Sequence, residues 1–419
     1  MNLIVETGFK PVSTCRNGGC MSDKSCPIPE TFQSMFWSIL YLTLVFFLTF
    51  ISRFIFSPLL PTISNELNIS TGQAGSIFLI SSFGFFIGAV SSGFVSSRIN
   101  HKGTLTLSIF CVAIALFICV LFTSLSTIRL AMLVIGIAAG FNLPSITAII
   151  TAIVSRPDWG KALAVQQLAP PSSLILGPLL TVNVLQWFPW RYLMGGIAVF
   201  VFLIALTLLI IAKVGDFPGD APRVSLARFI LSQRSFWILI VLFALGMGGQ
   251  IGVYAMMPLY LVTERGMDAE AANTFVGLSQ VSALFMTFFA GWVTDKIGEK
   301  KAIGIFLLVS GIVTALLGVF SGPWLKVMVF LQPALIACYF PPGFAALSRI
   351  VQPDYRSLAT SWVTPTALVL GGGLLPTALG YMGETYSIGA GISMAGILII
   401  LGFPLAFFLK LIDKMEDGC

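Results

Sequence analysis

The chain has 419 residues, of which 57% are apolar and only 10% are charged, and its mean hydropathy is +0.97. Soluble proteins carry about 25% charged residues, so this composition argues against a soluble enzyme or a nucleic-acid-binding protein. The formal net charge of +6 is interpreted as Lys and Arg retained on the cytoplasmic side of a membrane.

Residues 1–34 form a polar stretch that we predict to be a disordered cytoplasmic tail. It contains Cys15, Cys20 and Cys26, but their spacing matches no zinc or redox motif, so we expect no metal and no cofactor. The stretch also lacks the apolar core and cleavage pattern of a signal peptide. Met35 stands just before the first apolar run, and a chain starting there is expected to fold.

Twelve apolar runs follow, each long enough to cross a bilayer as a helix of roughly 20 residues. They span about 36–60, 73–97, 103–124, 129–154, 162–185, 191–213, 235–262, 271–294, 302–322, 325–348, 357–382 and 388–412. The longest polar link, 214–234, separates six runs from six. We therefore expect an all-α membrane protein with bundles at 35–213 and 235–412, a cytoplasmic linker at 214–234 and a cytoplasmic tail at 413–419.

The basic residues predict the orientation of the spans. With both termini in the cytoplasm, 18 of the 23 Lys and Arg residues lie inside, and only Arg129, Arg191, Arg265 and Lys326 lie outside. Because the loops that stay in the cytoplasm are enriched in Lys and Arg, we expect a multi-pass protein of the plasma membrane with both termini cytoplasmic.

The two halves also repeat each other in sequence. Pro170 matches Pro365 and Gly177 matches Gly372, both at an offset of 195 residues, while Pro61 matches Pro258 at 197. This agreement predicts two pseudo-symmetric six-helix bundles. Transporters built from such repeats place the substrate site between the repeats, near the middle of the membrane.

The strongest local motif follows the eighth run, where Gly291, Asp295, Lys296 and Gly298 precede a basic loop. It resembles the G-x-x-x-D-[RK]-x-G-x-[RK] signature of the major facilitator superfamily. The resemblance implies that these residues are gating residues of an alternating-access transporter, with Asp295 pairing across helix ends.

The equivalent loop after the second run has Gly93 and Arg98, but Ser97 stands where the signature has Asp and Asn100 stands where it has Gly. This departure puts the N-terminal half of the latch in doubt.

Arg53 is the only charged residue in the interior of any predicted span. A charge at a helix centre costs about 2.5–3.5 kcal/mol even on lenient insertion scales, and no carboxylate lies in a span to neutralise it. A guanidinium facing a water-filled cavity can bind a carboxylate or a phosphate through paired hydrogen bonds. The alternative is that Arg53 bonds to backbone carbonyls at a helix break near Pro58 and Pro61.

The repeat places Gln250 at the position equivalent to Arg53, since each stands eight residues before a proline, and Tyr254 lies one turn further along. An Arg in this position of the first span resembles the organophosphate:phosphate antiporter and anion:cation symporter branches. The former branch has a second Arg where this chain has Gln250, which favours a monoanion such as a small carboxylate over a phosphate ester.

Other polar residues within the spans are candidates to line a substrate cavity. They are Asn142, Gln166, Gln280, Tyr339 and Trp362. Each of them could instead form a hydrogen bond between helices.

The sequence shows no catalytic group, because it has no nucleophile dyad, no intramembrane carboxylate pair and no phosphate-binding loop. The leading hypothesis is a secondary transporter of a small organic anion that acts as a monomer in the lipid bilayer and couples to a proton or a counter-anion. The alternative is a drug or amphiphilic-metabolite exporter, suggested by 36 Phe residues and by Gly177-Pro178. A remote alternative is a receptor that transports nothing.

Overall fold

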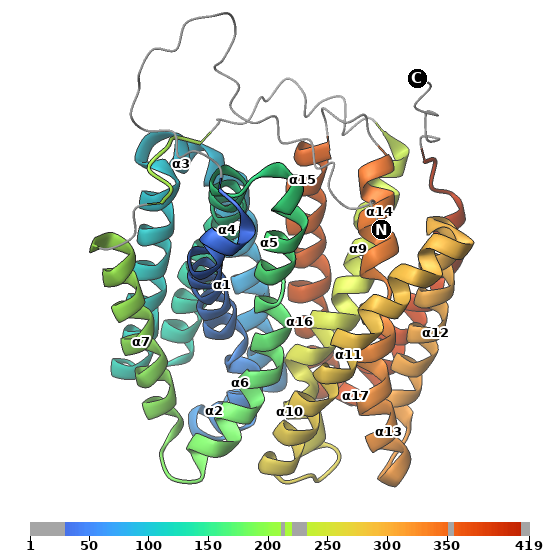
Figure 1. The fold of residues 1–419 in the computed structure, drawn as a ribbon. Coiled ribbons are helices and arrows are strands. Elements are labelled where there is room, and N and C mark those ends of the chain that lie inside the picture. The colour runs from blue at the N-terminus through green and yellow to red at the C-terminus, as the bar shows by residue number, and fades with distance from the viewer. Residues whose placement is uncertain (1–29, 211–213, 220–232, 351–355, 412–419) are drawn as a thin grey trace, which may run out of the picture.

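The computed structural model describes residues 30–210, 214–219, 233–350 and 356–411, which fold into helices joined by short loops (Figure 1). Eleven helical segments are long and apolar enough to cross a membrane. One of them, α3 (Thr71–Leu121), has 51 residues and changes direction at Ile99 and Asn100. At about 1.5 Å per residue it is long enough for two spans, so the described chain crosses the membrane twelve times and the predicted all-α membrane fold is confirmed.

The first half comprises α1 (Phe32–Phe54) continuing into α2 (Phe56–Leu67), then α3, α4 (Leu125–Ile153), η1 (Arg156–Asp158), α5 (Trp159–Gln166) continuing into α6 (Ala169–Leu185), and α7 (Trp190–Ile210). The second half comprises α9 (Arg234–Met247), η2 (Gly248–Gly252) and α10 (Val253–Thr263) as one span, then α11 (Ala269–Ile297), α12 (Glu299–Val319), α13 (Gly322–Ala337) with α14 (Phe340–Arg349), α15 (Arg356–Ala367) with η4 (Leu368–Leu374) and α16 (Leu375–Thr385), and α17 (Ile388–Phe407).

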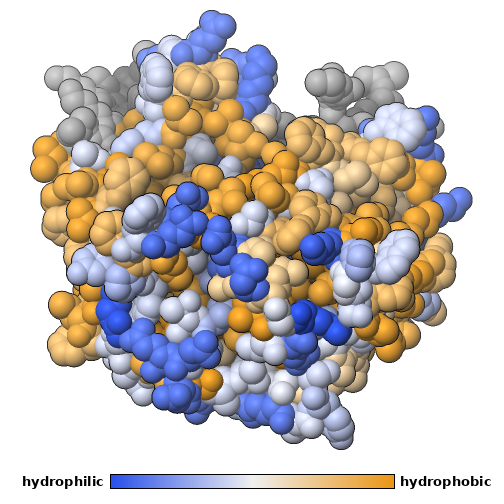
Figure 2. Space-filling view, turned by 90° about the horizontal axis from the view of Figure 1, so that it is seen from below, coloured by the Kyte–Doolittle hydropathy of each residue, from blue (hydrophilic) through white to orange (hydrophobic). Residues whose placement is uncertain are grey.

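The helices run between two faces of the molecule (Figure 1). The face at the top of the figure, which we call the linker face, carries residues 98–102, 155–161 and 214–219. The face at the bottom, which we call the opposite face, carries residues 68–70, 186–189, 264–268 and 386–387. Figure 2 looks onto the opposite face, where hydrophilic residues are interspersed among hydrophobic ones that continue to the borders.

Two glutamates, 198 residues apart, connect the first and last spans of each half on the opposite face. Glu66, at the end of α2, accepts hydrogen bonds from the indole N–H of Trp190 at 2.6 Å and from Arg191, both at the start of α7. Glu264, just after α10, accepts from the backbone amides of Ile388 and Gly389 at the start of α17. The two bundles are thus closed in the same way, as expected for a repeat.

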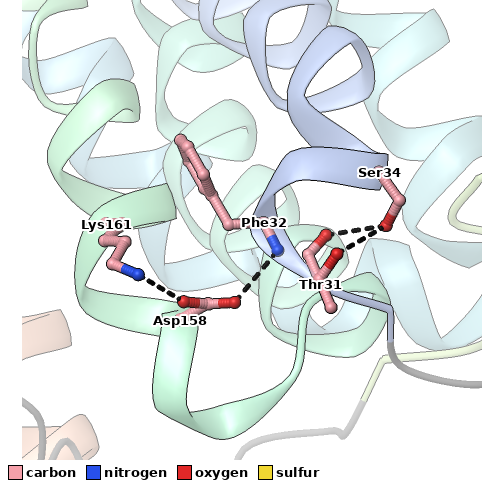
Figure 3. Close-up of polar contacts among 5 residues, drawn as sticks. All are labelled: Thr31, Phe32, Ser34, Asp158 and Lys161. Carbon is pink, nitrogen blue, oxygen red and sulfur yellow. Dashed lines mark hydrogen bonds and ion pairs between the residues drawn. The ribbon is translucent and has the colours of Figure 1, made fainter.

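The start of α1 is fixed by a loop from another part of the chain (Figure 3). Asp158 accepts a hydrogen bond from the backbone N–H of Phe32 at 3.1 Å and pairs with Lys161 at 2.8 Å. Glu30 pairs in extended conformation with Val154. Because these contacts extend order beyond the apolar run, the helix begins at Phe32, whereas the predicted disordered tail reached residue 34. Cys15, Cys20 and Cys26 lie outside the described residues.

Hydrogen bonds join the two halves to each other, and they lie in the region from the middle of the molecule to the opposite face. The hydroxyl of Thr71 donates to the carbonyl of Gly380 at 2.7 Å, and the amide of Gly72 donates to Glu384 at 2.9 Å. A pseudo-symmetric bond runs from Gln186 to Glu270 at 3.2 Å. Deeper in the molecule, further bonds join Ser57 to the carbonyl of Tyr254, Asn273 to the carbonyl of Pro58, Tyr254 to the carbonyl of Leu174, and Thr377 to the carbonyl of Gly75. The halves are therefore closed against each other on the opposite face.

The linker begins by docking on the loop after the second span. The amides of His101 and Lys102 donate to the carbonyls of Phe217 and Gly215 at 3.2 and 2.9 Å, and the His101 ring packs against Phe217 with centroids 5.0 Å apart. His101 is only 8% exposed. A basic loop of this kind favours a solvated histidine, and the structure buries it because the linker segment covers the loop.

Candidate functional site

Five spans are interrupted within their length. The first breaks at Ile55, the fifth at Gln167 and Leu168, and the tenth at Cys338 and Tyr339. The seventh and eleventh contain the π-helical segments η2 and η4. Such segments are frequent at functional sites, and broken spans free backbone groups where they line a binding cavity. The predicted residues Arg53, Gln166, Gln250 and Tyr339 all lie at or next to these interruptions.

Arg53 lies two residues before the break between α1 and α2 and is 3% exposed. Its Nε donates to the hydroxyl of Ser81 at 2.9 Å and its Nη2 to the hydroxyl of Ser82 at 2.8 Å, both on α3. The rings of Phe54 and Phe85 lie with their centroids 5.2 and 5.4 Å from the guanidinium carbon. Within the described chain no carboxylate pairs with this cation.

These contacts differ from those expected if Arg53 bonded to the backbone at the helix break. The chain does break directly after it, but the guanidinium bonds to two serine hydroxyls rather than to the carbonyls freed by the break. Neutral hydroxyls satisfy two of the five N–H donors of an arginine and leave its charge uncompensated. Among the described residues the remaining donors have no hydrogen-bond partner.

Phe54 connects Arg53 to Tyr254 in the other half. The Phe54 and Tyr254 rings meet edge to face with centroids 6.4 Å apart. The Tyr254 hydroxyl, however, donates to the carbonyl of Leu174 on α6 at 3.2 Å. Tyr254 therefore serves as a contact between the halves, and its ring touches Phe54, the residue next to Arg53.

Gln250 stands in the π-helical segment η2 and donates from Nε2 to the side-chain carbonyl of Gln280 at 3.2 Å, while its own Oε1 is buried without a partner among the described residues. Gln280 lines a cavity of about 10 Å³ together with Tyr254 and Gln332. A volume of roughly 10–15 Å³ holds one water molecule. The structure thus brings Gln250, Gln280 and Tyr254 together, as a small polar cluster in the second half.

Asn142 and Gln166 belong to the first half and are fully buried. The Asn142 amide donates to Thr49, which lies one turn before Arg53 on α1. Gln166 donates to Thr147 at 3.3 Å. In the described chain, the side-chain oxygen of each amide has no partner. Asn142 thus lies near the arginine, whereas nothing joins Gln166 to it directly.

Tyr339 and Trp362 lie in the core of the second half. Tyr339 is 0% exposed, its ring packs against Phe243 at 5.5 Å, and its hydroxyl has no partner among the described residues. Trp362 is half-buried against the same hydrophobic cluster. The structure does not bring either residue to Arg53.

The partners of Arg53, namely Ser81, Ser82 and Phe85, were not predicted from the sequence. Ser81 and Phe85 are four residues apart and therefore share one face of α3. Because the same span has further serine pairs at 91–92 and 96–97, the sequence alone does not single out the pair at 81–82.

The sequence profile described as the Major Facilitator Superfamily matches residues 42–286 and 264–418. The chain belongs to this superfamily. Its members are transporters rather than enzymes, and the chain is accordingly a multi-pass transporter of the superfamily.

Two characterised relatives cover most of the chain at low identity. The multidrug efflux protein YfmO of Bacillus subtilis (strain 168) is 24% identical over 392 residues, covering 87% of this chain and 90% of that protein. The gallate transporter of Pseudomonas putida is 20% identical over 385 residues, covering 82% of this chain and 83% of that protein. Members that export drugs and members that carry an organic anion are thus both similar to this chain.

Solved structures of the superfamily share the fold. A bacterial homologue of the human lysosomal transporter Spinster, in an inward-facing and unoccupied conformation, superposes with a TM-score of 0.79 at 16% identity, covering 91% of this chain and 98% of that one.

The predicted gating residues of the superfamily motif lie on the linker face. Arg98, Asp295 and Lys296 are exposed, and the Lys296 ammonium lies 3.8 Å from the Trp292 ring centroid. Gly298 has φ +82° and ends α11, a conformation that favours glycine. The expected pairing of Asp295 is absent from the described residues in this state, and the ion pair formed nearby joins Glu299 to Arg349 at 2.7 Å.

A glycine at these positions of the motif can allow two helices to approach closely. A Cβ added at Gly291 would meet nothing within 4 Å, so no helix packs closely there in this state. Gly93 is half-buried, and its carbonyl accepts from the hydroxyl of Ser96 at 3.3 Å within α3.

Proposed function

We propose that the protein moves a small organic monoanion, of the monocarboxylate kind, across the membrane by alternating access, with Arg53 binding the anionic group. The observation that carries this proposal is the buried guanidinium, held by hydroxyls and facing no carboxylate among the described residues. A cation kept in the membrane at a cost of several kcal/mol is a functional group by default.

An aromatic monocarboxylate fits these surroundings best. Phe54 and Phe85 flank the guanidinium, so a substrate ring would replace water next to apolar faces. The similarity to a gallate transporter supports this class. Gln250 stands where the organophosphate:phosphate antiporter branch has a second arginine, which supports a substrate with a single negative charge.

The state and orientation are part of the proposal. Basic residues such as Arg98 and Lys296 support a cytoplasmic linker face with both termini inside the cell. The bonds between the halves near the opposite face support a state that is closed to the outside. With no carboxylate inside a span, coupling to a proton carried on the substrate or to a counter-anion fits best.

Uptake into proteoliposomes tests the assignment. Nicotinate and gallate are the anionic probes, and nicotinamide is the neutral analogue of nicotinate. We expect uptake of the anions alone, with Arg53→Gln and Arg53→Lys abolishing it. Arg129→Gln is the matched control, because Arg129 also bonds to a serine of α3, Ser76, but near the opposite face. Full anion uptake by Arg53→Gln would sink the assignment.

Export of amphiphilic compounds is the second candidate. An apolar surface groove of about 480 Å³ lies between α1, α6 and α7, lined by residues that include Phe47, Leu180 and the exposed Phe200, and drug-sized ligands occupy pockets of roughly 300–1,000 Å³. Extrusion of a quinolone or another uncharged or cationic drug, unaffected by Arg53→Gln but reduced by Gly196→Phe in this groove, would select export over anion transport.

A further inference from the structure

The hydrogen bonds of Arg53 leave only one edge of its guanidinium free. A guanidinium makes paired hydrogen bonds either through Nε and Nη2 or through Nη1 and Nη2. Ser81 accepts from Nε at 2.9 Å and Ser82 from Nη2 at 2.8 Å, so the two serines occupy the first edge. In the described chain, Nη1 has no hydrogen-bond partner, and the second edge keeps its two donors, one on Nη1 and one on Nη2.

Both serines are held firmly enough to define this geometry. Each is 0% exposed, so water does not compete for the hydroxyls. Ser82 also packs against the other half of the protein, because a Cβ added at Gly373 of η4 would lie 2.8 Å from the Cβ of Ser82 and 3.1 Å from the Cα of Leu79. The backbone of η4 is therefore in close contact with the segment that carries the serines.

We propose that Ser81 and Ser82 are positioning residues that turn Arg53 so that it presents a single edge, Nη1 with Nη2, to one carboxylate. This inference rests on the proposed function and makes it more specific. One free edge binds one carboxylate through two parallel hydrogen bonds. A dianion that needs both edges loses half of its contacts, so the serine pair selects monoanions over dicarboxylates.

The contact between Ser82 and Gly373 makes this selection depend on the arrangement of the two halves. Gly373 belongs to the second half, and a Cβ added there would lie 2.8 Å from the Cβ and 3.1 Å from the hydroxyl oxygen of Ser82. An added methyl at Gly373 would move Ser82 without removing its hydroxyl. The variant Gly373→Ala thus perturbs the position of the serine, whereas Ser82→Ala removes its hydrogen bond and keeps its Cβ.

Equilibrium binding to the purified full-length protein tests the proposal, with nicotinate as the monoanion and pyridine-2,3-dicarboxylate as the dianion. A hydrogen bond to a charged group is worth about tenfold or more in affinity. We therefore expect Ser82→Ala to weaken nicotinate binding about tenfold and to reduce the preference for nicotinate over the dianion by a similar factor. Gly373→Ala should change both quantities in the same direction.

Three further variants separate positioning from general stability. Ser92→Ala, which removes a buried hydroxyl elsewhere on α3, should leave affinity and preference unchanged. Ser81→Thr keeps a hydroxyl and should retain more of the preference than Ser81→Ala does. A serine that only stabilised the fold would lower the melting temperature and leave the preference unchanged.

The outcomes for the two proposals differ. Wild-type preference in the Ser81→Ala, Ser82→Ala double variant would overturn the positioning role, even if Arg53→Gln abolished nicotinate binding. If the wild-type protein bound neither anion, the monocarboxylate assignment itself would be wrong, and the inference built on it would fail with it.

Discussion

The backbone amide of Gly72, in the first turn of α3, donates a 2.9 Å hydrogen bond to the carboxylate of Glu384, which lies at the end of α16 in the other half of the protein. A carboxylate at a helix N-terminus is stabilised by the free amides and by the helix dipole. This bond therefore acts as a helix cap provided by one half to the other, and it must break before the opposite face can open.

Removing this cap should shift the conformational equilibrium. Loss of a helix cap is worth about 1 kcal/mol, or roughly a fivefold change in a two-state ratio. We expect Glu384→Ala to raise the population open at the opposite face about fivefold, as measured by spin-label distances between the ends of α3 and α16. An unchanged distance distribution would show that the cap does not hold this face closed.

Replacing Arg53 with an apolar residue should separate stability from function. Arg53→Met fills a similar volume and removes a buried charge that only hydroxyls and rings surround. We expect the free energy of unfolding to equal that of the wild type or to exceed it by about 1 kcal/mol. Anion uptake should be lost. A large fall in the melting temperature would indicate that the arginine is mainly structural.

The contacts before Met35 should contribute to the fold of the first half. A chain starting at Met35 loses the pairing of Glu30 with Val154 and the bond from Phe32 to Asp158. We expect it to melt at a lower temperature than the full chain, while deletion of residues 1–29 causes little change. Asp158→Ala removes the same bond to Phe32. It should therefore lower the melting temperature of the full chain but hardly change that of the shortened chain. If the two changes lowered the melting temperature additively, Asp158 and Phe32 would not be in contact.

The open space around Gly291 predicts that a side chain added there changes the transport rate but not the melting temperature. A Cβ added there meets nothing within 4 Å, so Gly291→Ala should leave the melting temperature unchanged. If the motif closes the linker face in the opposite state, the same variant should slow transport severalfold. Normal transport rates would mean that no close helix approach forms at Gly291 during the cycle.

The two π-helical segments should be sensitive to any added side chain. A Cβ at Gly371 of η4 would overlap the carbonyl of Ala244 and the amide of Gly248, where the two segments meet. Overpacking of this kind costs about 1–3 kcal/mol, so Gly371→Ala should lower the melting temperature by several degrees. Gly196→Ala, at a position with no atom within 4 Å, is the control.

Much of the fold could be predicted from the sequence, because spans are encoded locally. Twelve apolar runs, basic loops and matching prolines such as Pro61 and Pro258 are visible without any contact information. The docking of the linker at Phe217 could not be predicted, since a buried His101 in a basic loop depends on a segment more than 100 residues away.

The candidate site was predictable only in part, and for a physical reason. A charge such as Arg53 is conspicuous in an apolar span, so its importance follows from the cost of burying it. Its partners Ser81 and Ser82 are ordinary residues of a membrane helix, and only tertiary packing brings their hydroxyls to the guanidinium. The same limit applies to Tyr254, whose hydroxyl bonds to α6 in this state.

The bonds of Glu66 and Glu264 have a consequence for splitting the chain in its linker and producing it as two polypeptides. Each glutamate joins the first and last spans of its own half, so each half has its own closing contact that does not involve the linker. Chains ending at residue 219 and beginning at residue 233 should therefore reassemble into a working protein when produced together, and chains cut within either half should not.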